Sequence, residues 1–527
     1  GIDTSKQGGV RVYPTATGLQ PVLSFPVKNE QEFKKLLLNL WDLDIKTTPP
    51  PDAKLARQVP PSVKQKELKS KLEKNERLIF KLYDGFLRSE PGYVHFSTLV
   101  ENIRLAKAAL PVNLAEGYKI AAVVDGAAQP AAKRKQSFEA AKKELLAAIV
   151  KGEGEAAEVF AARKAVTEHQ VAELERFFVE AERVFLGWNI SSEKKEATVN
   201  IDLVGLPNTD LEKSVELLDT TPDEFAGVSK TDAVFSLSAN FALDPLRKAF
   251  LKTSSVVDRA ALKKIVADDK NAGAEVKAME GDLIDLLFDL AEGASDLGVA
   301  NTFVRSWKAD DGSLSTVAGG RLPEGGKAKI EKLLTTLASR DPANKLEEKV
   351  ETAGEIEIHK LTVPKLSQEV PEFVGQDGAV YVGLHEKTVW VAAGTNSLEL
   401  LKKAIGEVAA TGPKNGLVLD LTLKLGPYID VLNNWYTRHP AAAPKKVETG
   451  KKSGAKKTAE PRKVEALISP EDLRKIAVDV FKQGKDTFSL TLGRQEKTAQ
   501  VRIRLDEGLI RFAGTAASKF VKENLED

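Results

Sequence analysis

The chain has 527 residues, of which 42% are hydrophobic, enough for about three or four domains of ordinary size. Lys and Arg number 77 against 76 Asp and Glu, and a formal net charge of +1 excludes an overall field that steers the chain onto nucleic acid. The absence of Cys excludes disulfides, thiolate metal sites and cysteine nucleophiles. No apolar run approaches the roughly 20 residues of a membrane-spanning helix, so we expect no transmembrane segment.

The first residue is Gly1 rather than Met. We interpret this start as that of a mature protein whose targeting segment has been removed, or of a trimmed chain. The first interpretation leads us to expect an extracytoplasmic location, in the periplasm or on the cell surface.

Residues 1–117 are predicted to form an α+β piece with a proline-rich insertion. The insertion, residues 47–65, contains PPPD and PP, which favour extended chain over helix or strand. The other elements predicted in this piece are strands at 21–27, 78–82 and 93–96, a helix at 30–40, and a helix that ends near Leu110.

Residues 118–230, 231–341 and 415–527 share one order of predicted elements, namely strand, two helices, two strands and helix. In each segment a proline opens the first helix and a phenylalanine lies in the next strand. The two residues are similarly spaced in all three segments, from Pro130 to Phe185, from Pro245 to Phe303 and from Pro427 to Phe488. The pattern predicts tandem repeats of a β-α-α-β-β-α unit. Residues 342–414 form a further α+β piece similar to the N-terminal one.

The hydrophobic periodicity gives each segment its predicted elements. The first has strands at 118–125, 185–190 and 197–204, helices at 131–150 and 156–184, and a helix from Pro207 to Leu218. The second has strands at 233–239, 300–307 and 313–317, and helices from Pro245, at 282–291 and from Pro323 to about 338. The piece at 342–414 has strands at 356–363, 380–384 and 388–392 and a helix at 397–408. The third segment has strands at 417–423, 487–492 and 499–505, an entry proline at Pro427, and helices at 470–481 and near 515–525.

These elements predict an α+β fold in which antiparallel sheets are covered on one face by helices. Long helical hairpins, the first formed by residues 131–184, are expected to project as insertions. Their apolar positions are suited either to a self-contained antiparallel pair or to docking against another subunit.

No motif in the sequence carries catalytic or cofactor chemistry. The five histidines lack the HExxH spacing that places two metal ligands on one helical face. The segment GGRLPEGGK at 319–327 lacks the P-loop spacing and predicts a strand end followed by a proline-initiated helix. No GxSxG nucleophile elbow is present. We therefore assign no catalytic, cofactor-binding or metal-ligating residue and expect a protein that is not an enzyme, with a hydrolase as the least favoured class.

The low-complexity tract at 441–463 is the one strongly basic segment of the sequence. It is interpreted either as a solvated linker or as an electrostatic arm for an anionic envelope polymer or lipid. It has no aromatic residue for base stacking, so specific nucleic-acid binding is not expected. Its basic residues are Lys445, Lys446, Lys451, Lys452, Lys456, Lys457, Arg462 and Lys463.

Residues 93–218 carry the stretches HFSTLVENIRLAKAAL, YKIAAVVD and FLGWNISSEKKEATVNIDLVG around a long helical insertion. In this pattern the chain resembles exported proteins of planctomycete bacteria that have no assigned activity. The resemblance implies a cleaved signal peptide and a location outside the cytoplasm. It brings no cofactor and no functional residues.

The sequence as a whole favours a non-catalytic structural or protein-interaction protein, as a component of an envelope or surface assembly. Its expected partner is another protein or a second copy of the chain. The alternative is a soluble periplasmic carrier that encloses an apolar ligand between sheet and helices.

Overall fold

The computed structural model describes residues 9–15, 18–29, 79–82, 85–90, 92–97, 118–269, 273–438 and 470–524. The helices predicted at 30–40 and up to Leu110, the proline-rich insertion at 47–65 and the basic tract at 441–463 lie outside these residues.

All strands of the described residues belong to one sheet of 18 strands. They are β1 (Gly9–Thr15), β2 (Gly18–Pro26), β3 (Ile79–Leu82), β4 (Gly85–Glu90), β5 (Tyr93–Ser97), β6 (Ile120–Asp125), β7 (Ala181–Ser191), β8 (Glu196–Gly205), β9 (Phe235–Ala242), β10 (Val299–Lys308), β11 (Leu314–Arg321), β12 (Lys345–Ala353), β13 (Ile356–Thr362), β14 (Ala379–Leu384), β15 (Thr388–Ala393), β16 (Leu419–Lys424), β17 (Thr487–Gln495) and β18 (Thr498–Asp506). From edge to edge their order is β3-β4-β5-β2-β1-β6-β7-β8-β18-β17-β16-β9-β10-β11-β15-β14-β13-β12, and every neighbouring pair is antiparallel except β1 and β6.

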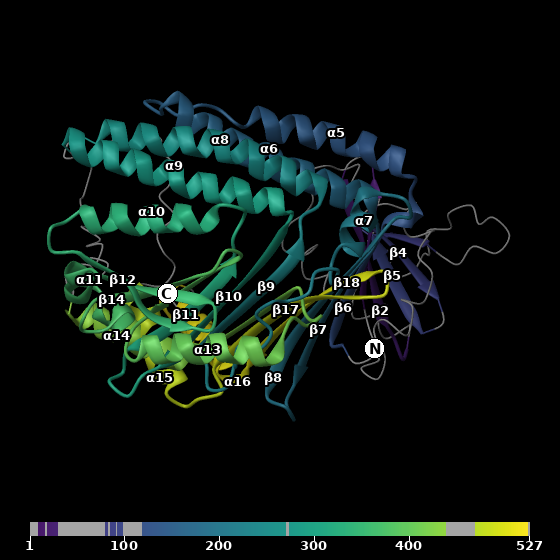
Figure 1. Cartoon of the computed structure of the whole chain (residues 1–527). Coiled ribbons are helices and arrows are strands. Elements are labelled where there is room, and N and C mark those ends of the chain that lie inside the picture. Colours follow the sequence, from purple (N-terminus) through teal and green to yellow (C-terminus); the bar gives the residue numbers. More distant parts are fainter. Residues whose placement is uncertain are drawn as a thin grey trace, which may run out of the picture.

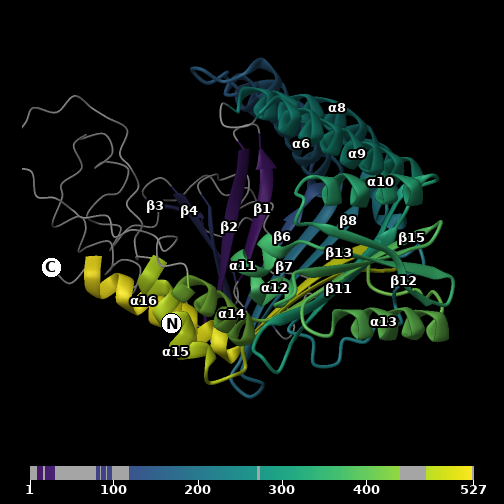
Figure 2. The ribbon, with the colours of Figure 1, turned by 60° about the vertical axis from the view of Figure 1, so that its left-hand side comes forward.

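Helices lie on both sides of this sheet, as Figures 1 and 2 show. One side carries α5 (Ala131–Ala147), α6 (Ala157–Glu180), α8 (Pro245–Asp268), α9 (Ala274–Leu297) and α10 (Gly326–Ser339), and the other carries α13 (Ser397–Thr411), α14 (Leu425–Arg438), α15 (Pro470–Phe481) and α16 (Glu507–Asn524). The remaining described helices are α7 (Asp210–Glu216), α11 (Pro364–Glu369), α12 (Pro371–Val374) and the short 3₁₀ turn η2 (Gly126–Ala128).

The mixed helix and strand composition and the antiparallel pairing agree with the α+β prediction, but its arrangement differs in two respects. One continuous sheet replaces the several sheets expected, and helices cover both of its faces. The reason is visible in the core clusters, because alternate residues of a strand point to opposite faces and both sets are apolar near α10 and α13. Leu334 of α10 belongs to one buried cluster with Leu361 and Val382, whereas Ile405 of α13 belongs to another with Phe303.

The two long hairpins do not project separately. In the structure α5 pairs with α6 and α8 pairs with α9, as expected for self-packing, but α6 also packs along α8. The four helices therefore form one layer (Figure 1). Packing of the two hairpins buries the faces that each would otherwise expose to water.

Among the described residues, three parts of the chain follow the order strand, two helices, two strands and helix, namely β6 to α7, β9 to α10 and β16 to α16. Each contributes three strands that are neighbours in the sheet. The first and third parts meet through their last strands, β8 and β18, and the second and third meet through their first strands, β9 and β16.

Candidate functional site

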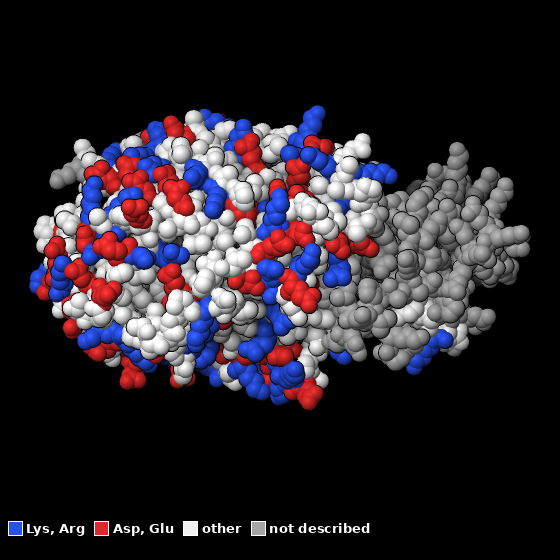
Figure 3. Space-filling view, turned by 45° about the vertical axis from the view of Figure 1, so that its right-hand side comes forward, with Lys and Arg blue, Asp and Glu red and all other residues white. Residues whose placement is uncertain are grey.

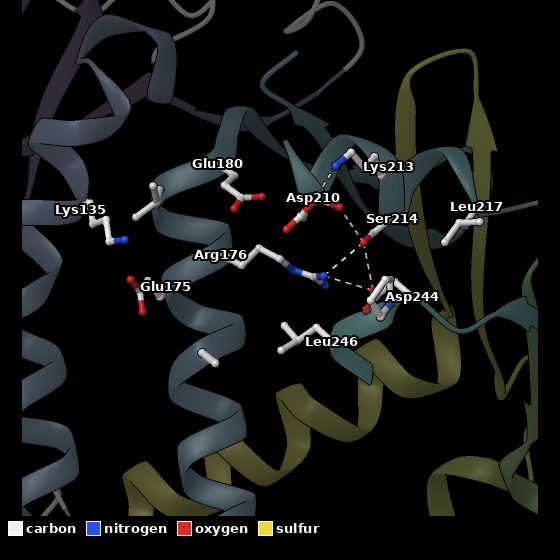
Figure 4. Close-up of a pocket in the computed structure, with 13 residues that line it drawn as sticks. Lys135, Glu175, Arg176, Glu180, Asp210, Lys213, Ser214, Leu217, Asp244 and Leu246 are labelled. Atoms are coloured by element: carbon white, nitrogen blue, oxygen red, sulfur yellow. Dashed lines mark hydrogen bonds and ion pairs between the residues drawn. The ribbon is translucent and has the colours of Figure 1, made fainter. Parts of the chain in front are cut away.

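A pocket of about 360 Å³ lies where α5, α6 and α7 meet the start of α8 (Figure 4). Its mouth is charged with both signs, since Lys135, Glu175 and Lys213 contribute to its walls. Its walls include apolar side chains, such as Val179 and Leu246, and buried polar groups from segments that are far apart in the sequence.

Three of these polar groups, Arg176, Ser214 and Asp244, form a network with Glu173 and Arg247, here called the Asp244 network. Asp244 Oδ2 lies 3.1 Å from Arg176 Nη1, 3.0 Å from Ser214 Oγ and 3.2 Å from Arg247 Nη1. Asp244 Oδ1 accepts the backbone N–H of Arg247 at 2.9 Å, so the same carboxylate caps α8. Arg176 Nη2 is also paired with Glu173 Oε2 at 2.8 Å.

The electrostatics of the network keep Asp244 ionised. Burial acts to raise the pKa of this carboxyl, but the N–H of Arg247, the guanidinium groups of Arg247 and Arg176, and the Ser214 hydroxyl outweigh it and lower the pKa. A carboxylate stabilised in this way is a weak base. It is therefore poorly suited to activate the adjacent Ser214 as a nucleophile.

His169 lies beside this network and contacts Phe250 and Glu173, not Ser214. Its ring stacks on Phe250 at a centroid distance of 3.8 Å, and its Nε2 lies 3.9 Å from Glu173 Oε1. Burial lowers the pKa of His169, and the nearby guanidinium groups of Arg247 and Arg176 add to this, while Glu173 opposes it. The arrangement joins the two hairpins through buried ion pairs and has no nucleophile held by a general base.

A second pocket, of about 530 Å³, opens on the face of the sheet that α13 covers. Its walls are mostly apolar and include Phe225, Trp390 and Ile405. Two of these belong to an aromatic cluster in which Phe225, Phe303 and Trp390 have ring centroids 5.1 to 5.4 Å apart. The volume lies within the range of about 300–1,000 Å³ that is usual for small-molecule sites.

An exposed apolar surface, here called the β6–β8 patch, lies on the face of the sheet that carries α7. It consists of Ile120, Leu186, Trp188, Ile190, Val199 and Ile201. Trp188 of β7 lies between two register partners, Ile120 of β6 and Val199 of β8. Leu186 of β7 lies opposite Ile201 of β8. The four large side chains of β6 and β7 are 39% to 53% exposed. Contiguous apolar side chains on an open strand face are typical of a contact surface.

The structure disperses most of the histidines. His95 is buried beside Ser24, with Oγ 2.8 Å from Nδ1, and His385 lies at the surface with Nε2 3.4 Å from Glu355. His439 lies outside the described residues. His359 is different, because α10 brings Glu331 to the strand that carries Glu357 and His359. This cluster, here called the His359 cluster, was missed by the sequence analysis. The spacing of Glu357 and His359 on one strand face was the available signal.

Other expectations from the sequence have mixed outcomes. The GGRLPEGGK segment contains the end of β11, as predicted, but α10 begins at Gly326, with Gly325 as its N-cap, and not at Pro323. The eight basic residues of the tract at 441–463 cannot be placed relative to any pocket, since they lie outside the described residues. No described helix is both long enough and apolar enough to cross a membrane.

Comparisons with known protein families, curated proteins and solved structures found nothing that matches this chain.

Proposed function

We propose that this chain is a non-catalytic structural or protein-interaction protein that acts outside the cytoplasm as a component of an envelope or surface assembly. The observation that carries the proposal is the β6–β8 patch, in which a tryptophan and three large aliphatic side chains stand exposed on adjacent strands. Tryptophan is enriched at the centres of protein interfaces, where its large surface is buried on association. The extracytoplasmic location rests on the resemblance to exported proteins.

The proposed architecture is a tandem array of one β-α-α-β-β-α unit. Support comes from the shared element order and from the way the units meet, first strand to first strand and last strand to last strand. Such joints leave a long sheet with large faces for contact. Figure 3 supports a protein partner rather than a polyanion, because basic and acidic side chains are interspersed over the face it shows.

Trp188→Glu is expected to weaken association with the partner chain by about 30-fold or more, because a buried interface tryptophan commonly contributes at least about 2 kcal/mol. The measurement is mass photometry, with electron microscopy, on the full chain isolated from its native envelope. Val391→Glu is the matched control, since Val391 is also an exposed apolar strand residue, at 37%, and lies outside the patch. Its association should be unchanged.

A strictly monomeric wild-type particle that brings no envelope component with it would count against the assembly proposal. Recovery of the chain from the cytoplasmic fraction of its source cells would count against the location. Equal association by wild type and Trp188→Glu would show that the contact lies elsewhere.

The second candidate is a carrier of an apolar ligand, favoured by the 530 Å³ pocket beside Trp390. Native mass spectrometry of the purified chain is then expected to show a bound small molecule, lost on collisional heating. Val408→Glu places a charge in the pocket wall and should abolish the added mass, while Val391→Glu should retain it. A native mass spectrum in which the wild-type chain shows only its polypeptide mass would exclude the carrier function.

A further inference from the structure

The His359 cluster places three metal-ligand groups together from two elements. Glu357 and His359 are two residues apart on β13 and therefore point to the same face of the sheet. Glu331 belongs to α10, which packs on that face. One ligand atom from each of the three side chains lies within 4.8 Å of the other two.

The imidazole in this cluster lacks the partner that a buried ring nitrogen needs. His359 is 4% exposed, and its Nε2 has no hydrogen-bond partner within the described part of the chain. Its neighbours in the core below α10 include Val382, its register partner on β14. An unpaired buried polar atom costs about 1–3 kcal/mol, so such atoms are uncommon in folded proteins.

We propose that Glu331, Glu357 and His359 bind a divalent transition-metal ion of the zinc class. One imidazole nitrogen and two carboxylate oxygens form a three-ligand set that suits zinc and leaves a fourth position for water or another ligand. Ligand atoms around a tetrahedral zinc lie about 3.4 Å apart, so a pair at the 4.8 Å limit would have to close by about 1.4 Å, which the flexible Glu side chains allow. Coordination through Nε2 would also give this nitrogen the partner that it lacks.

Two lysines compete with the ion for one of these ligands. Lys349 Nζ lies 2.8 Å and Lys327 Nζ 3.0 Å from Glu357. Hydrogen bonds from Lys349 and Lys327 lower the pKa of Glu357 to about 2, so the carboxylate is ionised at neutral pH. Lys349 is mostly exposed and can leave Glu357 when the ion binds.

Isothermal titration of the full chain with Zn²⁺ tests the site. We expect one ion per chain in the wild type and an affinity at least about tenfold lower in both His359→Gln and Glu331→Gln. Glu331 is half-buried, so its variant keeps the measurement valid if His359→Gln does not fold. The matched control is His385→Gln, which removes the surface His385–Glu355 pair and should leave the affinity unchanged.

Removal of the competing Lys349 should raise the affinity for Zn²⁺, whereas removal of a ligand lowers it. Lys349→Met is expected to tighten Zn²⁺ binding by up to about fivefold, the equivalent of one exposed ion pair. Zn²⁺ should also raise the melting temperature of the wild type but not that of Glu331→Gln. Absence of saturable binding by the wild type, or equal binding by wild type and Glu331→Gln, would overturn the proposal and leave Glu357 as the centre of a surface ion-pair cluster.

Discussion

Replacement of Arg305 by alanine is expected to lower the free energy of unfolding by about 3–5 kcal/mol, because it removes a buried cation and leaves the buried groups around it without their partner. Arg305 is 0% exposed, and its Nη1 donates to the carbonyls of Leu237 at 2.5 Å and Val304 at 3.0 Å. Its Nη2 donates to Ser238 Oγ at 2.7 Å. Urea unfolding of the full chain, followed by circular dichroism, gives the measurement.

The environment of Arg305 explains the size of this effect. Burial lowers the pKa of the guanidinium to about 10, against the opposing influence of Asp420 and Asp223. Arg305 is therefore charged at neutral pH and compensates the buried Asp223, whose own pKa is raised by burial. Asp223 belongs to an irregular segment covering this face, and Asn301 holds that segment by donating to the carbonyl of Pro222 at 2.9 Å.

Arg340→Ala is the control for Arg305, since Arg340 is half-exposed and makes one surface ion pair, 2.9 Å from Glu280. It should cost no more than about 1 kcal/mol. Arg305→Met combined with Asp223→Asn should cost less than the sum of the single changes, because neither charge is then left alone. Equal losses from Arg305→Ala and Arg340→Ala would show that the buried charge is not needed.

Asp244→Ala is expected to lower the free energy of unfolding by a similar amount, about 3–5 kcal/mol, and to loosen the junction between the two hairpins. Asp244 is 2% exposed and neutralises Arg176, which would remain buried without its partner. Loss of the cap on α8 contributes about 1 kcal/mol of this total. Hydrogen exchange of α6 and α8, measured alongside urea unfolding, locates the change.

The charge and the cap of Asp244 can be separated. Asp244→Asn retains an N-cap side chain and should cost less than alanine. Since the folded-state pKa of Asp244 is lowered, its contribution is present above the unfolded value of about 3.9 and is lost as the pH falls through the folded value. The asparagine variant should therefore show a flatter acid limb of stability against pH.

Asp210→Ala tests whether any change in the pocket wall lowers the free energy of unfolding. Asp210 contributes to the same pocket, but it is 74% exposed and pairs with Lys213 at 3.0 Å. A change within about 1 kcal/mol is expected. A loss as large as that of Asp244→Ala would assign the effect to the pocket and not to the buried ion pairs.

Local sequence pattern predicted most of the central elements, with errors at their ends. The helix expected at 156–184 ends at Glu180, because Val184 alternates as part of β7. The final helix begins at Glu507 and not at 515. Gly508, near the start of this helix, lets the helix backbone approach the backbone of Lys485 closely. Its N–H donates to the carbonyl of Lys485 at 2.7 Å, and a β-carbon at this position would lie 2.7 Å from the same oxygen.

Some elements gave too weak a pattern to be predicted. Strands β1, β4 and β12 and the short helices α11 and α12 were missed. In β12 six of nine residues are polar, KLEEKVETA, because it is the edge strand beyond β13 and meets solvent. Helix α9 extends to Leu297 past the predicted end at 291, and Gly293 within it lies where a β-carbon would be 2.7 Å from the ring of Pro323.

The α+β class, the balanced charge and the order of elements in the three similar segments could be predicted from the sequence, since these depend on local periodicity and composition. The joining of the described strands into one sheet, the pairing of β8 with β18 and the packing of α6 on α8 could be learned only from the folded structure. The β6–β8 patch and the proximity of Glu331 to His359 were likewise not predicted from the sequence. Contacts between residues far apart in the chain are set by which apolar faces can be buried together, and that choice leaves no local pattern in the sequence.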